Sequence, residues 1–152
     1  MYGGDMQVSR LWRALSIRWL YLVTIGHFVV GFLMSWFGDS ILFGSYNQIA
    51  IENFLLADSQ SVYELQVWWL AIFGATLQAF SILLAALIYL GDQHKNHRVW
   101  LLIIISLVIW GPQDIYFSAI KHIWINVWVD VAALACLLPV LVFLIVCDRA
   151  KN

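Results

Sequence analysis

The sequence has very few charged residues for its length. Lysine, arginine, aspartate and glutamate make up only 11% of its 152 residues, whereas 63% are apolar and 16% are aromatic. A soluble domain is roughly half apolar and about a quarter charged. Because so few charges cannot cover a folded chain of this size, most of its surface must face lipid. The composition excludes a soluble globular domain and a disordered chain.

Cysteines and basic clusters are also scarce. Cys136 and Cys147 lie on one expected helix, roughly 16 Å apart by the helical rise, so they cannot bridge each other. We interpret both as small apolar packing residues. Two cysteines are too few for a secreted disulfide scaffold, and a net charge of −1 without a basic block excludes a nucleic-acid-binding module. The expected partner is the lipid bilayer, not nucleic acid.

Long apolar runs, in contrast, are abundant. A bilayer core about 30 Å thick needs about 20 apolar residues of helix, and the sequence contains four such runs. We therefore predict an all-α, integral membrane four-helix bundle with up-down topology, in which residues 1–152 form a single membrane domain. The predicted spans are 19–37, 67–90, 99–118 and 123–147.

Basic residues gather at one end of this predicted bundle. Only Lys121 lies at the other end, so the positive-inside rule places both termini in the cytoplasm. A bacterial inner membrane is the predicted location. The residues at the basic end are Arg10, Arg13, Arg18, Lys95, Arg98, Arg149 and Lys151.

The segment before the first span has two interpretations. It is either a basic helix lying on the membrane surface or a cytoplasmic extension of the span itself. Its apolar stripe comprises Val8, Leu11, Trp12 and Leu15. Aromatic residues near the same end, Trp100 among them, are assigned to a belt at the membrane interface.

The outer loop, residues 38–65, is long enough to carry structure of its own. We predict a short interfacial helix within it, because several apolar residues share one helical face. These residues are Ile49, Ala50, Phe54 and Leu55. Ser45 with Gln48 and Ser61 with Glu64 match the capping box of a helix start, and Gly91 is predicted to end the second span as a left-handed cap.

Polar residues within the spans are the most informative feature, because a charge near the bilayer centre costs a few kcal/mol. Six polar residues fall between the midplane and the outer surface, on faces that also carry small residues. This pattern predicts a polar, ligand-binding pocket in the outer half of the bundle. The candidate binding residues are His27, Gln78, Gln113, Asp114, Asn126 and Asp130.

Several of these residues also have a structural interpretation. Asp114 and Asp130 would pair with Lys121, His122, Gln113 or a helix terminus in a structural network, since buried ionisable groups are paired or neutral. The third span contains Gly111-Pro112, where the helix either continues or breaks. If it breaks, Asp114 caps a new helix.

The chemistry open to this set of residues is narrow. A bis-histidine haem is disfavoured, because His27 and His122 lie at different depths, and no closely spaced ligands predict zinc. No cofactor or metal is therefore predicted. We predict one of two functions: binding of a lipid, quinone or isoprenoid, or an accessory role in a complex with a larger membrane protein. A homo-oligomer is a further possible assembly.

Two alternatives rest on the same acids. One is an intramembrane enzyme acting on a lipophilic substrate, with Asp130 or Asp114 as general acid or base and His27 as its partner. The other is an ion-coupled or proton-coupled transport component.

Overall fold

A computed structural model describes residues 3–54 and 60–149, with side chains from residue 10 onward. Within these ranges the chain is helical apart from short turns between the helices, so the predicted all-α fold is confirmed. The side chains of Val8, Leu55 and Lys151 lie outside this part of the chain. The helices are α1 (Gly3–Phe37), α2 (Ile41–Asn53), α3 (Gln60–His94), α4 (His97–Ile120) and α5 (Trp124–Arg149).

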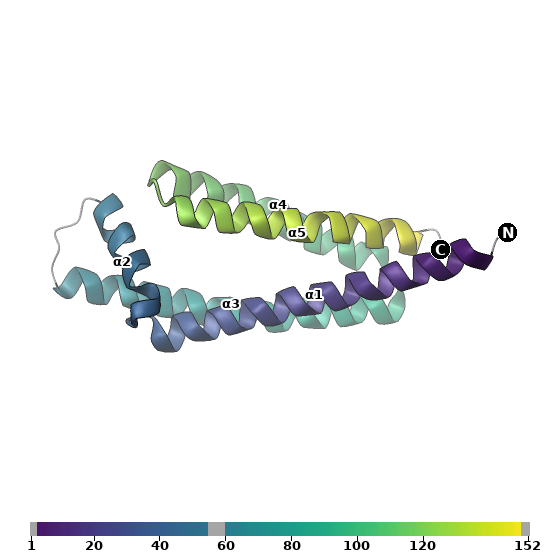
Figure 1. The fold of residues 1–152 in the computed structure, drawn as a ribbon, viewed down its shortest axis with the longest axis horizontal. Coiled ribbons are helices and arrows are strands. Elements are labelled where there is room, and N and C mark those ends of the chain that lie inside the picture. The colour runs from purple at the N-terminus through teal and green to yellow at the C-terminus, as the bar shows by residue number, and fades with distance from the viewer. Residues whose placement is uncertain (1–2, 55–59, 150–152) are drawn as a thin grey trace.

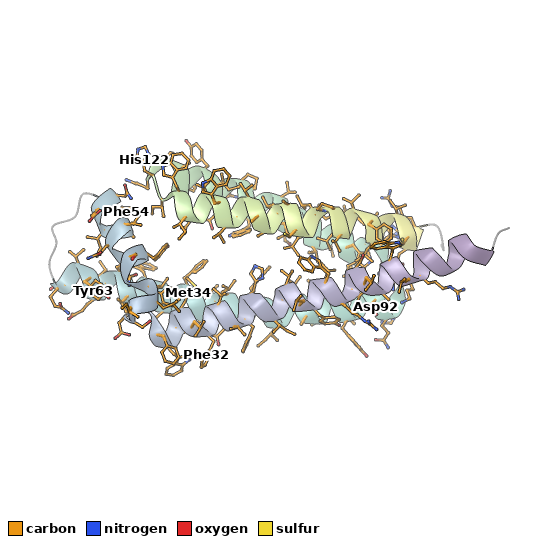
Figure 2. All side chains as sticks on the ribbon, viewed as in Figure 1. Phe32, Met34, Phe54, Tyr63, Asp92 and His122 are labelled. Carbon is orange, nitrogen blue, oxygen red and sulfur yellow. The ribbon has the colours of Figure 1, made fainter. Side chains whose placement is uncertain are left out.

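Four of these helices are long and apolar enough to cross a membrane, as predicted. They cover Arg10–Phe37, Gln60–His94, His97–Ile120 and Trp124–Arg149. The chain is therefore a multi-pass integral membrane protein. Large apolar side chains project outward along the bundle, as at Phe32 in Figure 2, which is 43% exposed. Such an exposed apolar surface matches a bilayer as solvent.

The long helices form two pairs, α1 with α3 and α4 with α5 (Figure 1). The pairs meet at the end where Gly3 and Arg149 lie, here called the terminal end. They diverge toward the opposite end, here called the α2 end, where α2 lies across the gap. The buried core occupies the terminal half, with Trp100, Leu141 and Leu144 wholly buried.

The α1–α3 pair is held close by small residues. A Cβ at Gly74 would lie 2.5 Å from the carbonyl oxygen of Gly31, so the two backbones nearly touch at this point. The Ser35 hydroxyl donates to the carbonyl of Ala71 at 3.0 Å across the same interface. Small residues permit this approach in membranes, where packing and interhelical hydrogen bonds drive association.

At the terminal end an ion cluster joins three helices. The guanidinium of Arg13 donates to both carboxylate oxygens of Asp148, at 2.9 and 3.1 Å, and to Asp92 at 2.6 Å. Lys95 also donates to Asp92 at 2.8 Å. The indole of Trp100 completes the cluster by donating to Asp148 at 2.9 Å. Trp100 is thus a core residue, and its assignment to an interfacial belt is wrong.

The helix ends differ from the predicted caps. Gly91 lies inside α3, which continues to His94, and the left-handed backbone occurs at Lys95 with φ of 50°. Glycine is required at position 91 by packing, because a Cβ there would lie only 2.7 Å from the Trp100 ring. The glycine cap is therefore wrong, because packing rather than turn geometry selects this residue.

The two predicted capping boxes are also displaced. The outer helix is present, but α2 begins at Ile41, so Ser45 lies within it. Likewise α3 begins at Gln60, which places Ser61 inside its first turn. In both cases the helix extends past the capping-box match, since such short motifs also occur within helices.

Two alternatives from the sequence are resolved. Helix α4 continues through Pro112, so Asp114 does not cap a new helix. At Gly111 the helix lies against Leu134 of α5, 2.8 Å from where a Cβ would stand. Helix α1 is continuous from Gly3 to Phe37, so the segment before the first span extends that span.

Candidate binding pocket

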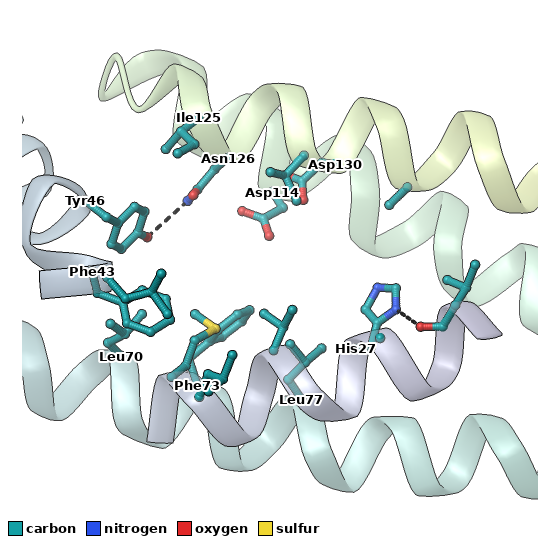
Figure 3. Close-up of a pocket in the computed structure, with 18 of the residues that line it drawn as sticks. His27, Phe43, Tyr46, Leu70, Phe73, Leu77, Asp114, Ile125, Asn126 and Asp130 are labelled. Atoms are coloured by element: carbon teal, nitrogen blue, oxygen red, sulfur yellow. Dashed lines mark hydrogen bonds between the residues drawn. The ribbon is translucent and has the colours of Figure 1, made fainter. Parts of the chain in front are cut away.

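A pocket of about 730 Å³ lies between the two helix pairs in the α2 half of the molecule (Figure 3). All the helices contribute to it, and most of its wall is apolar. Its apolar lining residues are Val23, Gly26, Val30, Leu33, Met34, Leu42, Phe43, Leu70, Phe73, Leu77, Trp110, Ile125, Val129 and Ala133. Ligand sites in proteins share this size and character: an apolar cavity with a few convergent polar groups.

The structure brings four of the six candidate residues together in this pocket. His27 comes from α1, Asp114 from α4, and Asn126 and Asp130 from α5. In Figure 3 the two acids occupy the α4–α5 wall, and His27 lies on the opposite wall. Residues far apart in the sequence thus form one polar patch inside an apolar cavity.

The other two candidates lie elsewhere. Gln78 sits in the α1–α3 interface, where its amide donates to the Ser35 hydroxyl at 3.2 Å and to the Gly74 carbonyl at 3.3 Å. Gln113 is exposed, and its amide donates to the Ile109 carbonyl of its own helix at 2.6 Å. Neither residue lines the pocket.

The carboxylate of Asp130 is the most unusual group in the pocket. Asp130 is only 5% exposed, and its Oδ2 atom has no hydrogen-bond partner among the described residues. Leaving a buried polar group unpaired costs about 1–3 kcal/mol, and more when it is charged. A positive charge near the carboxylate would offset this cost, and protonation would lower it by removing the charge.

Asp114 lies close enough to Asp130 for their charges to interact. It is half-buried, and it accepts a hydrogen bond from the Ser118 hydroxyl at 3.3 Å. Lys121, a partner considered from the sequence, instead stands over the ring of Phe54, 4.8 Å from its centroid. The two acids therefore face the pocket without a cationic partner among the described residues that line it.

The histidine on the opposite wall has a defined orientation. Nδ1 of His27 lies 2.8 Å from the carbonyl oxygen of Val23, one turn earlier in α1 (Figure 3). A carbonyl only accepts, so Nδ1 carries a proton. Nε2 is the ring nitrogen that remains for a ligand: it accepts a hydrogen bond when the ring is neutral and donates one when the ring is protonated.

The sequence did not reveal the contribution of α2. Leu42, Phe43 and Tyr46 enter the pocket from this helix. The Tyr46 hydroxyl accepts a hydrogen bond from the Asn126 amide at 3.5 Å, which connects α2 to α5 (Figure 3). Tyr46 follows Phe43 by three residues and Leu42 by four, a spacing that indicates one helical face. The sequence alone does not show that this face turns toward the bundle and not toward the membrane surface.

Helix α2 is itself positioned by a buried side chain. Asn47 is wholly buried and donates to the carbonyl of Gly38 at 2.9 Å. Gly38 allows this close turn, because a Cβ there would lie 2.8 Å from the Met34 carbonyl oxygen. The turn places the pocket-facing side of α2 over the space between the helix pairs.

Metal binding is not suggested by the described part of the chain. There, no group of three histidine, cysteine, aspartate or glutamate residues is arranged to hold an ion. The pocket also has far more room than a single ion needs. Its geometry suits an organic molecule with an apolar body and a small polar end.

Comparisons with known proteins add nothing to this geometry. No family model, curated protein or solved structure matches the chain.

Proposed function

We propose that this protein binds an amphipathic, lipid-like molecule in the pocket between its helix pairs. The apolar body would lie against the aromatic and aliphatic wall, and the polar end would meet Asp114, Asp130 and His27. The observation that carries this proposal is the pocket itself, about 730 Å³ of mostly apolar space with a buried, unpaired carboxylate oxygen. Lipids, quinones and isoprenoids have this general form.

Binding requires less of the site than catalysis does. Acid–base chemistry would need His27 to act with one of the acids, yet the hydrogen bond of its ring goes to its own helix. The two acids and the histidine occupy opposite walls (Figure 3). A ligand between the walls would contact both sides, which makes binding the simpler role.

Filling the pocket tests this proposal. Ala133 lines it and is half-buried, whereas the neighbouring Ala132 is exposed and does not line it. Ala133→Phe is expected to remove a co-purifying small molecule that wild type and Ala132→Phe both retain. Native mass spectrometry of protein purified in mild detergent, followed by analysis of the extracted lipids, measures this.

The same spectra distinguish the other candidate functions. A stoichiometric larger protein without any small molecule would contradict the binding proposal and favour an accessory subunit. Retention of the molecule by Ala133→Phe would place its site outside the pocket. Conversion of the molecule by wild type, lost in Asp130→Asn, would favour the enzyme.

We further propose that the terminal end faces the cytoplasm, in a bacterial inner membrane. Glu52 is exposed at the α2 end and Gln93 at the terminal end. In a background with Cys136 and Cys147 replaced by alanine, Glu52→Cys is expected to react with a membrane-impermeant maleimide in intact cells. Gln93→Cys is expected to react only after lysis. The reverse pattern would overturn this orientation.

A further inference from the structure

The pocket is rich in acceptors and negative charge. Asp114 and Asp130 supply two carboxylates, and Nε2 of His27 accepts a hydrogen bond when the ring is neutral. Among the described residues that line it there is no lysine or arginine. The wall can therefore offer a ligand negative charge and lone pairs, but few protons.

The buried acid shows what is missing. Asp130 lines the pocket and is only 5% exposed, and its Oδ2 atom has no hydrogen-bond partner among the described residues. The nearby Asp114 repels a negative charge on Asp130. A donor that carries positive charge and approaches the two acids from the pocket would relieve this repulsion. An uncharged hydroxyl would not relieve it, and a carboxylate would add to it.

One aromatic ring on the wall of the acids suits the same head group. Trp110 lines the pocket and precedes Asp114 by one turn of α4. The faces of aromatic rings attract ammonium groups, most strongly where water is excluded. The remaining wall is mostly apolar and suits an alkyl or terpenoid body.

Resting on the proposed function, we infer that the ligand is a cationic amphiphile: a protonated amine on an apolar body. Its ammonium group lies between Asp114 and Asp130, and its apolar body runs along the wall formed by α1 and α3 (Figure 3). The amine replaces the cation that the described lining lacks.

A matched series of probes tests the head group. Dodecylamine, dodecanol and dodecanoate share one chain and differ only in charge. Each is titrated calorimetrically against the full-length protein in phosphatidylcholine nanodiscs, with empty nanodiscs subtracted. Both the amine and the alcohol can donate to a carboxylate, but only the amine adds a positive charge, so it is expected to bind roughly tenfold or more tightly than the alcohol. The carboxylate is expected to bind most weakly.

Variants assign the preference to the two acids. Asp114→Asn/Asp130→Asn is expected to bring dodecylamine to the affinity of dodecanol and to leave dodecanol unchanged. Glu52→Gln neutralises an exposed acid outside the pocket and is expected to change neither. If the double variant does not fold, Asp114→Asn alone is expected to reduce the amine preference, because that acid is only half-buried.

The outcomes separate this inference from the proposal beneath it. Equal affinity for amine and alcohol, with both lost in Ala133→Phe, would overturn the cationic ligand while leaving the amphiphile site intact. An amine preference that Asp114→Asn leaves undiminished would also overturn it. Binding of all three probes that Ala133→Phe does not alter would overturn the pocket as a site altogether.

Discussion

Replacing Gly74 with valine is expected to separate α1 from α3 and to lower the free energy of unfolding by about 3 kcal/mol, the upper end for overpacked interiors. A Cβ at this position would lie 2.5 Å from the Gly31 carbonyl oxygen and 2.7 Å from the Ser35 hydroxyl. The carbonyl belongs to the helix backbone and cannot rotate away, so the helices themselves must move. Unfolding by SDS titration in mixed micelles measures the loss.

Gly26 provides the matched control on the same pair. Nothing lies within 4 Å of a Cβ built there, and alanine is a better helix former than glycine by up to about 1 kcal/mol. Gly26→Ala is therefore expected to leave stability unchanged or to raise it slightly. If Gly74→Val proved as stable as Gly26→Ala, the close α1–α3 contact would be wrong.

Much of this architecture follows from the sequence because a bilayer restricts the choices. Every backbone group must be satisfied within the lipid, so four long apolar runs can only become four helices. Helical spacing and depth then indicate which polar residues approach one another. Depth places His27, Asp114, Asn126 and Asp130 between the midplane and the outer surface, and the structure gathers these four in one pocket.

The remaining features depend on rotations and contacts that depth alone does not fix. Gln113 precedes Asp114 by one residue, about 100° around the helix, and that step is enough to direct it away from the pocket. Gln78 lies one turn after Gly74 on α3, so the close contact of α1 and α3 holds it half-buried between them. Helical periodicity shows which residues share one face of a helix, but not which other helix packs against that face.

The ion cluster at the terminal end was missed for a related reason. Arg13 was counted among residues that orient the chain, and near a membrane surface a basic side chain usually remains hydrated. Its burial depends on Asp148, which lies 135 positions away at the other end of the chain. Acidic residues near span ends carry little weight in topology arguments, so no sequence signal linked the pair.

Arg13→Met is expected to destabilise the protein by about 3–5 kcal/mol, the cost of removing one partner from a buried ion pair. The variant leaves Asp148 wholly buried, with Trp100 as its remaining donor. It also removes a contact that joins α1 to both α3 and α5. The same SDS titration measures the effect, and less monodisperse protein is expected after detergent extraction.

A second substitution shows whether the uncompensated charge is responsible. Asp148→Asn in the Arg13→Met background removes that charge yet keeps a carbonyl oxygen as an acceptor for the Trp100 indole, so the double variant is expected to be more stable than Arg13→Met alone. Arg18→Met changes an exposed arginine on the same helix and is expected to cost less than about 0.5 kcal/mol. No recovery in the double variant, or equal losses for the two arginines, would contradict the buried pair as the contact that closes the terminal end. Because the helix pairs are held together at the terminal end, they diverge only toward the α2 end, and the pocket lies there.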